Sequence, residues 1–245
     1  MGEVPEAIAD GTQEALMRSV TSVNVACGGH AGDQQTMKTT IEQALRWKVA
    51  IGAHPGYADR ANFGRLELKL PPKEIADSVF DQVCAFNEVA KRCGARVVHV
   101  KPHGALYNQA VVRRDLAEAI AEGVARWRCD VVLVGLAGSP MLEVFRKAGF
   151  AVGAEAFADR RYEPDGTLRP RKFENALIRN PEEAARQALS MVERGVVIAC
   201  DGTEVSIDAQ TLCIHGDTPG APEIAAMVAR TLRQSGVALG ALSQP

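Results

Sequence analysis

The sequence predicts an α/β protein with a parallel β-sheet, folded as a single domain over residues 1–245. Three observations support this prediction. The 245 residues are 47% hydrophobic, and a single α/β barrel commonly has about this length. Short apolar runs alternate with longer amphipathic stretches, as they do in βαβ units. No change in composition, linker or fixed-period repeat divides the chain.

Six apolar runs are predicted to be strands, and a seventh run is weaker. The six are 22–27, 49–54, 96–101, 130–135, 150–155 and 211–216, and the weaker one is 195–200. Helices are expected between them near 34–47, 72–93, 114–127, 139–148, 181–194 and 221–235. The helix near 72 has prolines at its start and Gly94 directly after its end, both favoured positions.

Composition and charge exclude several classes of protein. The chain has 28 Lys and Arg against 30 Asp and Glu, a net charge of −2, so it lacks the basic excess of nucleic-acid-binding proteins. No apolar run approaches the roughly 18 residues of a membrane-spanning helix. The acidic start has no apolar signal-peptide core, and the six cysteines are dispersed without a C-x-x-C pair. We therefore expect a cytoplasmic protein with no nucleic-acid or membrane partner.

Four of the five histidines lie at or just after the C-terminal ends of predicted strands. These are His30, His54, His103 and His215. In barrels and open α/β sheets, active sites are built at this edge of the sheet. The placement therefore predicts that the four imidazoles converge on one site.

The segment 97–108 carries three polar residues on one face of a strand. His99, Lys101 and His103 alternate with valines, so we expect the polar face to point into the barrel. Buried polar groups without partners are costly, and an internal hydrogen-bond network is therefore the structural alternative. We favour that alternative for His99 and a functional role for Lys101 and His103.

Three further segments place polar residues at strand ends. In 24–33, Asn24 has space beside it, and His30 and Asp33 could share a helical face unless Asp33 only caps the next helix. Glu155 is followed by Asp159 and Arg160, and the latter could bind a carboxylate or phosphate. His215 and Asp217 follow the last predicted strand.

Neutral imidazoles together with carboxylates suit either general acid–base catalysis or a divalent metal. The chemistry that this set most readily supports is hydrolysis at a carbonyl or amide, with Lys101 stabilising a developing oxyanion. The chain contains neither of the two common glycine-rich nucleotide-binding loops.

Seven motifs resemble those of the LamB/YcsF lactam-utilization family. They are N-V-A-C-G-G-H-A-G-D at 24–33, G-A-H-P at 52–55, N-F-G-R at 62–65, H-V-K-P-H-G-A-L-Y-N at 99–108, G-L-A-G-S at 135–139, E-A-F-A-D-R-R-Y at 155–162 and C-I-H-G-D at 213–217. They occur in order and cover most of the chain.

The resemblance implies the A subunit of bacterial ATP-dependent 5-oxoprolinase, which acts with the B and C subunits. That enzyme opens the lactam of 5-oxoproline to L-glutamate, with ATP as co-substrate. The implied fold is a barrel of about seven parallel strands, similar to the glycoside hydrolase/deacetylase superfamily. Family members begin with a strand of the form D-L-N-x-D-x-G-E, and this chain starts inside that motif at Met1-Gly2-Glu3. We therefore expect the first strand, with its acidic and amide groups, to be missing and one barrel edge to be open.

The leading hypothesis assigns catalysis to strand-end residues. His54 or His103 is the acid–base group, and Lys101 is the electrophilic partner. Glu155 or Asp159 either orients another catalytic side chain or acts as a base. The expected substrate-binding residues are Asn24, His30, Asp33, Arg160, His215 and Asp217. The alternatives are a metal-dependent carbohydrate deacetylase, with a divalent ion on two of His30, His54 and His103, and a non-catalytic substrate-binding subunit.

Overall fold

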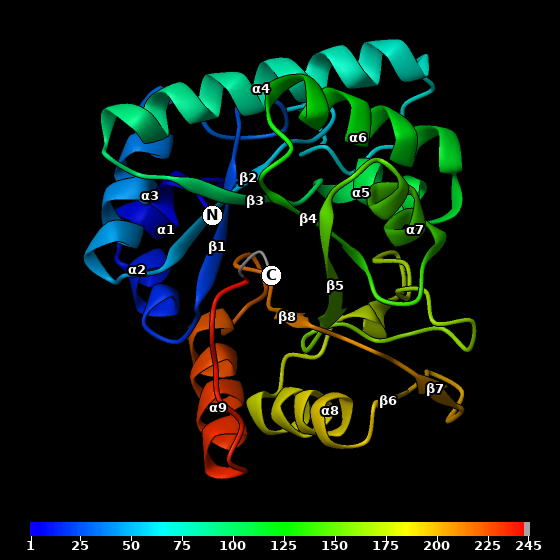
Figure 1. Cartoon of the computed structure of the whole chain (residues 1–245). Coiled ribbons are helices and arrows are strands. Elements are labelled where there is room, and N and C mark those ends of the chain that lie inside the picture. Colours follow the sequence, from blue (N-terminus) through cyan, green and yellow to red (C-terminus); the bar gives the residue numbers. More distant parts are fainter. Residues whose placement is uncertain (243–245) are drawn as a thin grey trace.

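The computed structural model describes residues 1–242, and its main sheet has six parallel strands. The strands are β1 (Ser22–Ala26), β2 (Ala50–His54), β3 (Val97–Val100), β4 (Val132–Leu136), β5 (Ala151–Phe157) and β8 (Thr211–Cys213). They pair in the order β1-β2-β3-β4-β5-β8. The sheet curls into a half-barrel, with β1 and β8 as its two edges (Figure 1). The expected parallel α/β architecture is confirmed.

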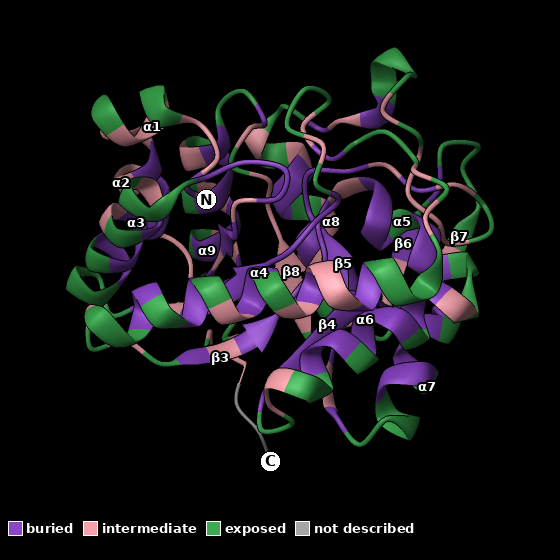
Figure 2. Ribbon diagram, turned by 90° about the horizontal axis from the view of Figure 1, so that it is seen from above, coloured by how far each residue is buried: buried purple, intermediate pink, exposed green. Residues whose placement is uncertain are grey.

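Helices cover the outer face of the curled sheet (Figure 1). They are α3 (Gln34–Arg46), α4 (Pro72–Arg92), α5 (Gly104–Val112), α6 (Arg114–Trp127), α7 (Pro140–Lys147), α8 (Pro181–Glu193) and α9 (Ala221–Gln234). Figure 2 shows buried residues alternating along α4 and α6 with exposed ones. This is the pattern of helices that bury one apolar stripe and leave a polar face in water.

The ends of α4 follow from local sequence preferences. Pro72 occupies the first turn, where its missing N–H is no loss because that group would have no helical partner. Gly94 follows the C-terminus with φ +70°, a left-handed conformation that ends helices and that glycine adopts without strain. The predicted helix over 72–93 is confirmed to within one residue.

The weaker run at 195–200 does contain a strand, but this strand does not join the main sheet. It forms β6 (Val196–Ile198), which pairs antiparallel with β7 (Glu204–Ser206) in a separate ribbon. The physical reason is the turn between them. Gly202 has φ +91°, a left-handed conformation suited to a tight turn, and this turn pairs β6 with β7 instead of with the main sheet.

Three helices in the described residues were not expected. They are α1 (Pro5–Ala9), α2 (Thr12–Met17) and α5 (Gly104–Val112). Six of the nine residues of α5 are buried, the polar Gln109 among them, so its sequence lacks the alternation of apolar and polar positions that reveals the other helices. None of the helices described here is long and apolar enough to cross a membrane.

The first residues of the chain lie beside edge strand β1. The amino group of Met1 donates to the carbonyl of Asn24 at 2.8 Å, and the amide of Ala26 donates to the carbonyl of Met1 at 3.0 Å. This pairing carries Glu3 past the C-terminal end of β1. The expectation that no acidic group of the first-strand motif is available is therefore wrong for Glu3, since its carboxylate reaches the histidines described next.

Candidate active site

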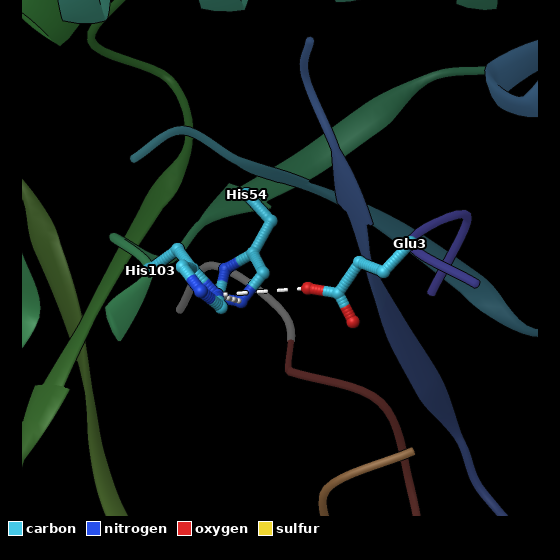
Figure 3. Close-up of side chains that lie close together, drawn as sticks. All are labelled: Glu3, His54 and His103. Atoms are coloured by element: carbon cyan, nitrogen blue, oxygen red, sulfur yellow. Dashed lines mark hydrogen bonds and ion pairs between the residues drawn. The ribbon is translucent and has the colours of Figure 1, made fainter. Parts of the chain in front are cut away.

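Three side chains from distant parts of the chain point toward one another at the C-terminal edge of the sheet (Figure 3). His54 is the last residue of β2, His103 follows β3, and Glu3 lies beside β1. Nδ1 of His103 is 3.1 Å from Nε2 of His54 and 3.6 Å from Oε1 of Glu3. Both histidines are buried. Together with His30, these residues are called the histidine cluster below.

Backbone carbonyls determine the tautomers of His54 and His103. Nδ1 of His54 lies 2.6 Å from the carbonyl of Lys101, and Nε2 of His103 lies 2.9 Å from the carbonyl of Phe63. A carbonyl can only accept, so each of these nitrogens carries the proton. The remaining nitrogens, Nε2 of His54 and Nδ1 of His103, therefore face each other with lone pairs.

Burial keeps both imidazoles uncharged. Burial lowers the pKa of His54 well below its ordinary value, and His103 adds to this effect. Burial also lowers the pKa of His103 to about 3, and there His30 adds to the effect. Burial alone would raise the pKa of Glu3. However, the amino terminus and the hydrogen bond from His30 hold that pKa well below its ordinary value. Two lone pairs and a carboxylate therefore converge on one point, an arrangement that a cation would satisfy.

His30 holds the carboxylate of Glu3 and stacks on His103. Its Nε2 donates to Oε1 of Glu3 at 3.0 Å, and its ring lies parallel to that of His103 with 3.6 Å between centroids. Its other nitrogen, Nδ1, is buried and has no hydrogen-bond partner among the described residues. A buried polar atom without a partner is costly, and such atoms often mark places where a ligand or water binds.

The loop between β2 and α4 covers the histidine cluster. The carbonyl of Phe63 accepts from His103, and Gly64 packs against the rings with φ +61°. A Cβ at position 64 would lie 2.7 Å from Cβ of His30. Glycine is thus required here both by backbone conformation and by the close approach to His30.

Lys101 lies in the barrel interior, where its ammonium group contacts two polar groups. Its Nζ is 2.7 Å from Oε1 of Glu155 and 3.2 Å from Sγ of Cys213, and the hydroxyl of Tyr107 donates to Oε2 of Glu155 at 3.1 Å. Burial opposes the charge on Lys101, but Cys213 and Glu155 raise its pKa above the ordinary value. A fixed ammonium group is therefore held in the barrel interior by Glu155, while the backbone carbonyl of the same lysine bonds His54.

His99 forms an internal contact, as the structural alternative predicted. Its Nε2 lies 2.9 Å from Oδ1 of Asn24, an amide oxygen that can only accept, so Nε2 donates. Burial lowers the pKa of His99 to about 4, so the ring is neutral near pH 7. Asn24 therefore faces the barrel interior with its oxygen already engaged.

His215 and Asp159 form a second acid–base pair. The carboxylate of Asp159 accepts from Nδ1 of His215 at 3.0 Å, from the backbone amide of His215 at 2.9 Å and from the hydroxyl of Thr218 at 2.7 Å. Burial opposes ionisation of Asp159, but His215 and then Thr218 lower its pKa to about 2. The ionised carboxylate keeps the proton on Nδ1. Among the described residues, no group bonds Nε2 of His215, which is left free to contact a ligand.

The other predicted site residues lie around this edge in different settings. Asp33 is exposed and caps α3, accepting from the amide of Thr36 at 2.8 Å. Arg160 is buried and donates to the carbonyls of Ala176 and Arg169. Asp217 is paired with two arginines at the rim. The capping alternative for Asp33 is thus confirmed, and His30 and Asp33 do not share a helical face.

Glu3 and Tyr107 are the residues that the sequence-based prediction missed. Glu3 precedes every predicted strand, so no strand end indicated it, although Gly2-Glu3 matches the end of the family's first motif. Tyr107 lies within the matched motif at 99–108, and this motif could have pointed to it. Its partner Glu155 is 48 residues away.

Comparison with known proteins places this chain in one family. The sequence model of the LamB/YcsF family matches residues 1–245. A protein from Methylococcus capsulatus, named as the A subunit of 5-oxoprolinase, is 48% identical over 232 residues, which is 95% of this chain and 89% of that protein. One of the same name from Pyrococcus furiosus is 44% identical over 227 residues, 93% of this chain and 89% of that protein. The crystal structure of a lactam utilization protein from Thermus thermophilus superposes with a TM-score of 0.91 at 43% identity, covering 99% of this chain and 97% of the other.

Proposed function

Because the chain belongs to the LamB/YcsF family, we propose that it is the A subunit of an ATP-dependent 5-oxoprolinase. In this role it opens the lactam of 5-oxoproline to L-glutamate while ATP is hydrolysed, in a complex with the B and C subunits. The observation that carries the proposal is the placement of Lys101, the histidine cluster and the His215–Asp159 pair at the C-terminal ends of neighbouring strands, where the Phe157 ring contacts both the ammonium group of Lys101 and the ring of His215. Relatives of the same name support it.

The proposed chemistry needs both an electrophile and groups that transfer protons. A lactam is a stable amide, and coupling to ATP, for example through phosphorylation of the amide oxygen, makes its carbonyl carbon easier to attack. Lys101 is suited to stabilise the negative charge that develops on that oxygen, since a fixed charge in a dry site is effective. Glu155 holds its ammonium group in place.

Proton transfer falls to the imidazoles. Nε2 of His54 and Nδ1 of His103 bear free lone pairs, and Nε2 of His215 is a third imidazole nitrogen that no described residue bonds. Asp159 then acts through His215, by fixing its ring and tautomer, rather than on the substrate. Asn24 and His30 are proposed to contribute to substrate binding directly. Arg160 and Asp217 are proposed to contribute to it indirectly, through the loops and arginines that they bond. Asp33 is proposed to contribute by ordering the start of α3 behind His30.

The donor set also fits a divalent metal. Glu3, His54 and His103 would hold the ion through one carboxylate oxygen and two imidazole nitrogens, all within 4.8 Å of one another. Each histidine already donates its other N–H to a backbone carbonyl, the outer support that metal-binding histidines normally have. When bound, such an ion supplies Lewis-acid activation of a carbonyl or a water.

The same donor set favours a second candidate function, a metal-dependent deacetylase acting on N-acetylated carbohydrates. Release of acetate from such a substrate by metal-loaded protein, with no dependence on ATP, would support it. A cytoplasmic location is also proposed, and all six cysteines are free thiols, as is usual in a reducing compartment.

The test is reconstitution of the complex from the purified A, B and C subunits. We expect release of phosphate and glutamate that requires 5-oxoproline, ATP and this chain together. Arg92→Gln, a change on the exposed face of α4, should leave the rate unchanged, whereas Lys101→Met should abolish it. Absence of turnover in a correctly assembled complex would refute the proposal.

A further inference from the structure

Two arginines from different loops share one carboxylate at the rim of the site. Arg65 lies in the loop after β2, and Arg171 lies in the loop after β5. Nη2 of Arg65 bonds Oδ2 of Asp217, and Nη1 of Arg171 lies 3.4 Å from the same oxygen. We call Arg65 and Arg171 the arginine pair.

The arginine pair has unused donors. A guanidinium group carries five N–H bonds, and among the described residues each of the two finds only Asp217 as a hydrogen-bond acceptor. The side chains are partly exposed, 37% for Arg65 and 27% for Arg171. Two positive charges thus face a single negative one at a place that a ligand can reach.

The arginine pair adjoins the histidine cluster. The guanidinium of Arg65 lies 4.9 Å from the centre of the Phe63 ring, and that ring lies 5.6 Å from the ring of His103. On the other side, Asp217 and Glu3 line one small cavity of about 20 Å³. The arginine pair therefore lies one aromatic ring away from the imidazoles, at the rim of the same site.

Arg160, which the sequence suggested as an anion-binding residue, does not have the exposed, unused donors of the arginine pair. It is buried, and its Nε and Nη2 donate to the carbonyls of Ala176 and Arg169. These bonds tie together the loop that carries Arg171. Arg160 is therefore suited to position Arg171, whereas the arginine pair is suited to contact a ligand.

We propose that the arginine pair is the oxyanion-binding subsite of this enzyme, and that Asp217 occupies it as an internal stand-in until substrate binds. The ligand is a carboxylate or phosphoryl group, because guanidinium groups bind planar and tetrahedral oxyanions with paired hydrogen bonds. Building on the proposed function, the oxyanion is either the carboxylate of the lactam substrate or a phosphoryl group of ATP.

This assignment predicts opposite effects for the two kinds of residue. Arg65→Gln and Arg171→Gln remove donors to the oxyanion, so they should raise the KM of the anionic substrate roughly 10- to 100-fold. Asp217→Asn removes the internal competitor, so it should lower that KM. If Asp217 instead only fastened the loop, its removal would weaken binding just as loss of an arginine does.

The experiment measures KM for 5-oxoproline and for ATP separately in the reconstituted complex. A rise confined to 5-oxoproline identifies the substrate carboxylate, and a rise confined to ATP identifies a phosphoryl group. Arg194→Gln is the matched control, since Arg194 forms an exposed ion pair with Glu204 at the separate β6–β7 ribbon. Arg171→Lys keeps the charge without the paired geometry and should give an intermediate KM.

A binding measurement separates this proposal from the proposed function. Inorganic phosphate and 5-oxoproline are titrated into the chain itself, with uncharged 2-pyrrolidinone as the comparison ligand. Weaker anion binding in the arginine variants, stronger binding in Asp217→Asn and unchanged 2-pyrrolidinone binding would support the subsite even if the complex did not turn over 5-oxoproline. Unchanged anion binding in both arginine variants, or weakened binding in Asp217→Asn, would overturn it.

Discussion

Nζ of Lys101 lies 2.7 Å from Oε1 of Glu155, although β4 separates the two strands that position these residues. Both side chains are almost fully buried, with 7% and 4% exposed. The curl of the sheet brings them together across the barrel interior. The pair holds a positive charge at the place where the proposed reaction would develop a negative one.

Breaking this pair should strongly destabilise the protein. Lys101→Met leaves the carboxylate of Glu155 buried without its partner, which typically costs about 3–5 kcal/mol. The double variant Lys101→Met/Glu155→Gln should recover part of the lost free energy of unfolding, because the buried charge is then absent. Urea unfolding measures this difference. Arg96→Gln, which breaks an exposed pair with Asp130, should cost less than about 1 kcal/mol. A similar cost for both single variants would contradict the structure.

Stability should fall as pH drops from about 6.5 to 4, partly because of His99. Its pKa is about 4 in the folded protein against an ordinary 6.5, so in this range the unfolded chain binds a proton that the folded protein does not. Each unit of difference is worth about 1.4 kcal/mol. The dependence should be shallower in His99→Gln, though His54 and His103 keep it from vanishing. The measurement is the free energy of unfolding of both proteins across this pH range. If His99 were exposed, the wild type and His99→Gln would show the same dependence on pH.

Gly64→Ala should damage the site more than a comparable glycine substitution elsewhere. Gly64 and Gly138 both have positive φ, +61° and +77°, so alanine strains the backbone at either position by about 1–2 kcal/mol. A Cβ would also meet His30 at 2.7 Å at position 64, whereas at position 138 nothing lies within 4 Å. Gly64→Ala should therefore lose activity and more thermal stability than Gly138→Ala. Equal effects would mean that the loop does not pack on the histidines.

Metal binding should depend on Glu3. Titration with Co²⁺, followed by its visible absorption, should reveal one site in the wild-type chain, because carboxylate and imidazole ligands suit such ions. Glu3→Gln removes one of three ligands and should weaken binding by roughly tenfold or more. Glu6→Gln, on the exposed surface of α1, is the control. If the two variants gave identical titrations, Glu3 would not be a ligand of the metal.

Asp159→Asn should lower turnover without abolishing substrate binding. The amide no longer fixes the proton on Nδ1 of His215, so the base loses its tautomer and its orientation. A fall in kcat of roughly 100-fold or more, with a small change in KM, is expected of a group that acts through a general base. Thr218→Val, which removes only one bond to Asp159, should have a smaller effect. A change in KM alone would argue against acid–base catalysis by His215.

Much of the fold could be predicted from local sequence. The predicted helix near 114–127 coincides with α6, and the six strong strand runs all pair in the parallel sheet. These elements have a clear period and turn residues at their ends. Helix α5 was not predicted, because six of its nine residues are buried and its sequence has no clear apolar stripe. The weaker run at 195–200 does form a strand, but its pairing with β7 instead of the main sheet could not be predicted from the run itself.

The sequence by itself determined the alternation of strands and helices, the family, and the placement of four histidines at strand ends. These features depend on neighbouring residues and on motifs that can be read along the chain. Only the tertiary structure decided which groups meet. Lys101 pairs with Glu155, and Arg65 pairs with Asp217. The unprotonated nitrogens of His54 and His103 face each other beside Glu3. Such contacts depend on how far the sheet curls and where the loops return, which are properties of the whole packed chain.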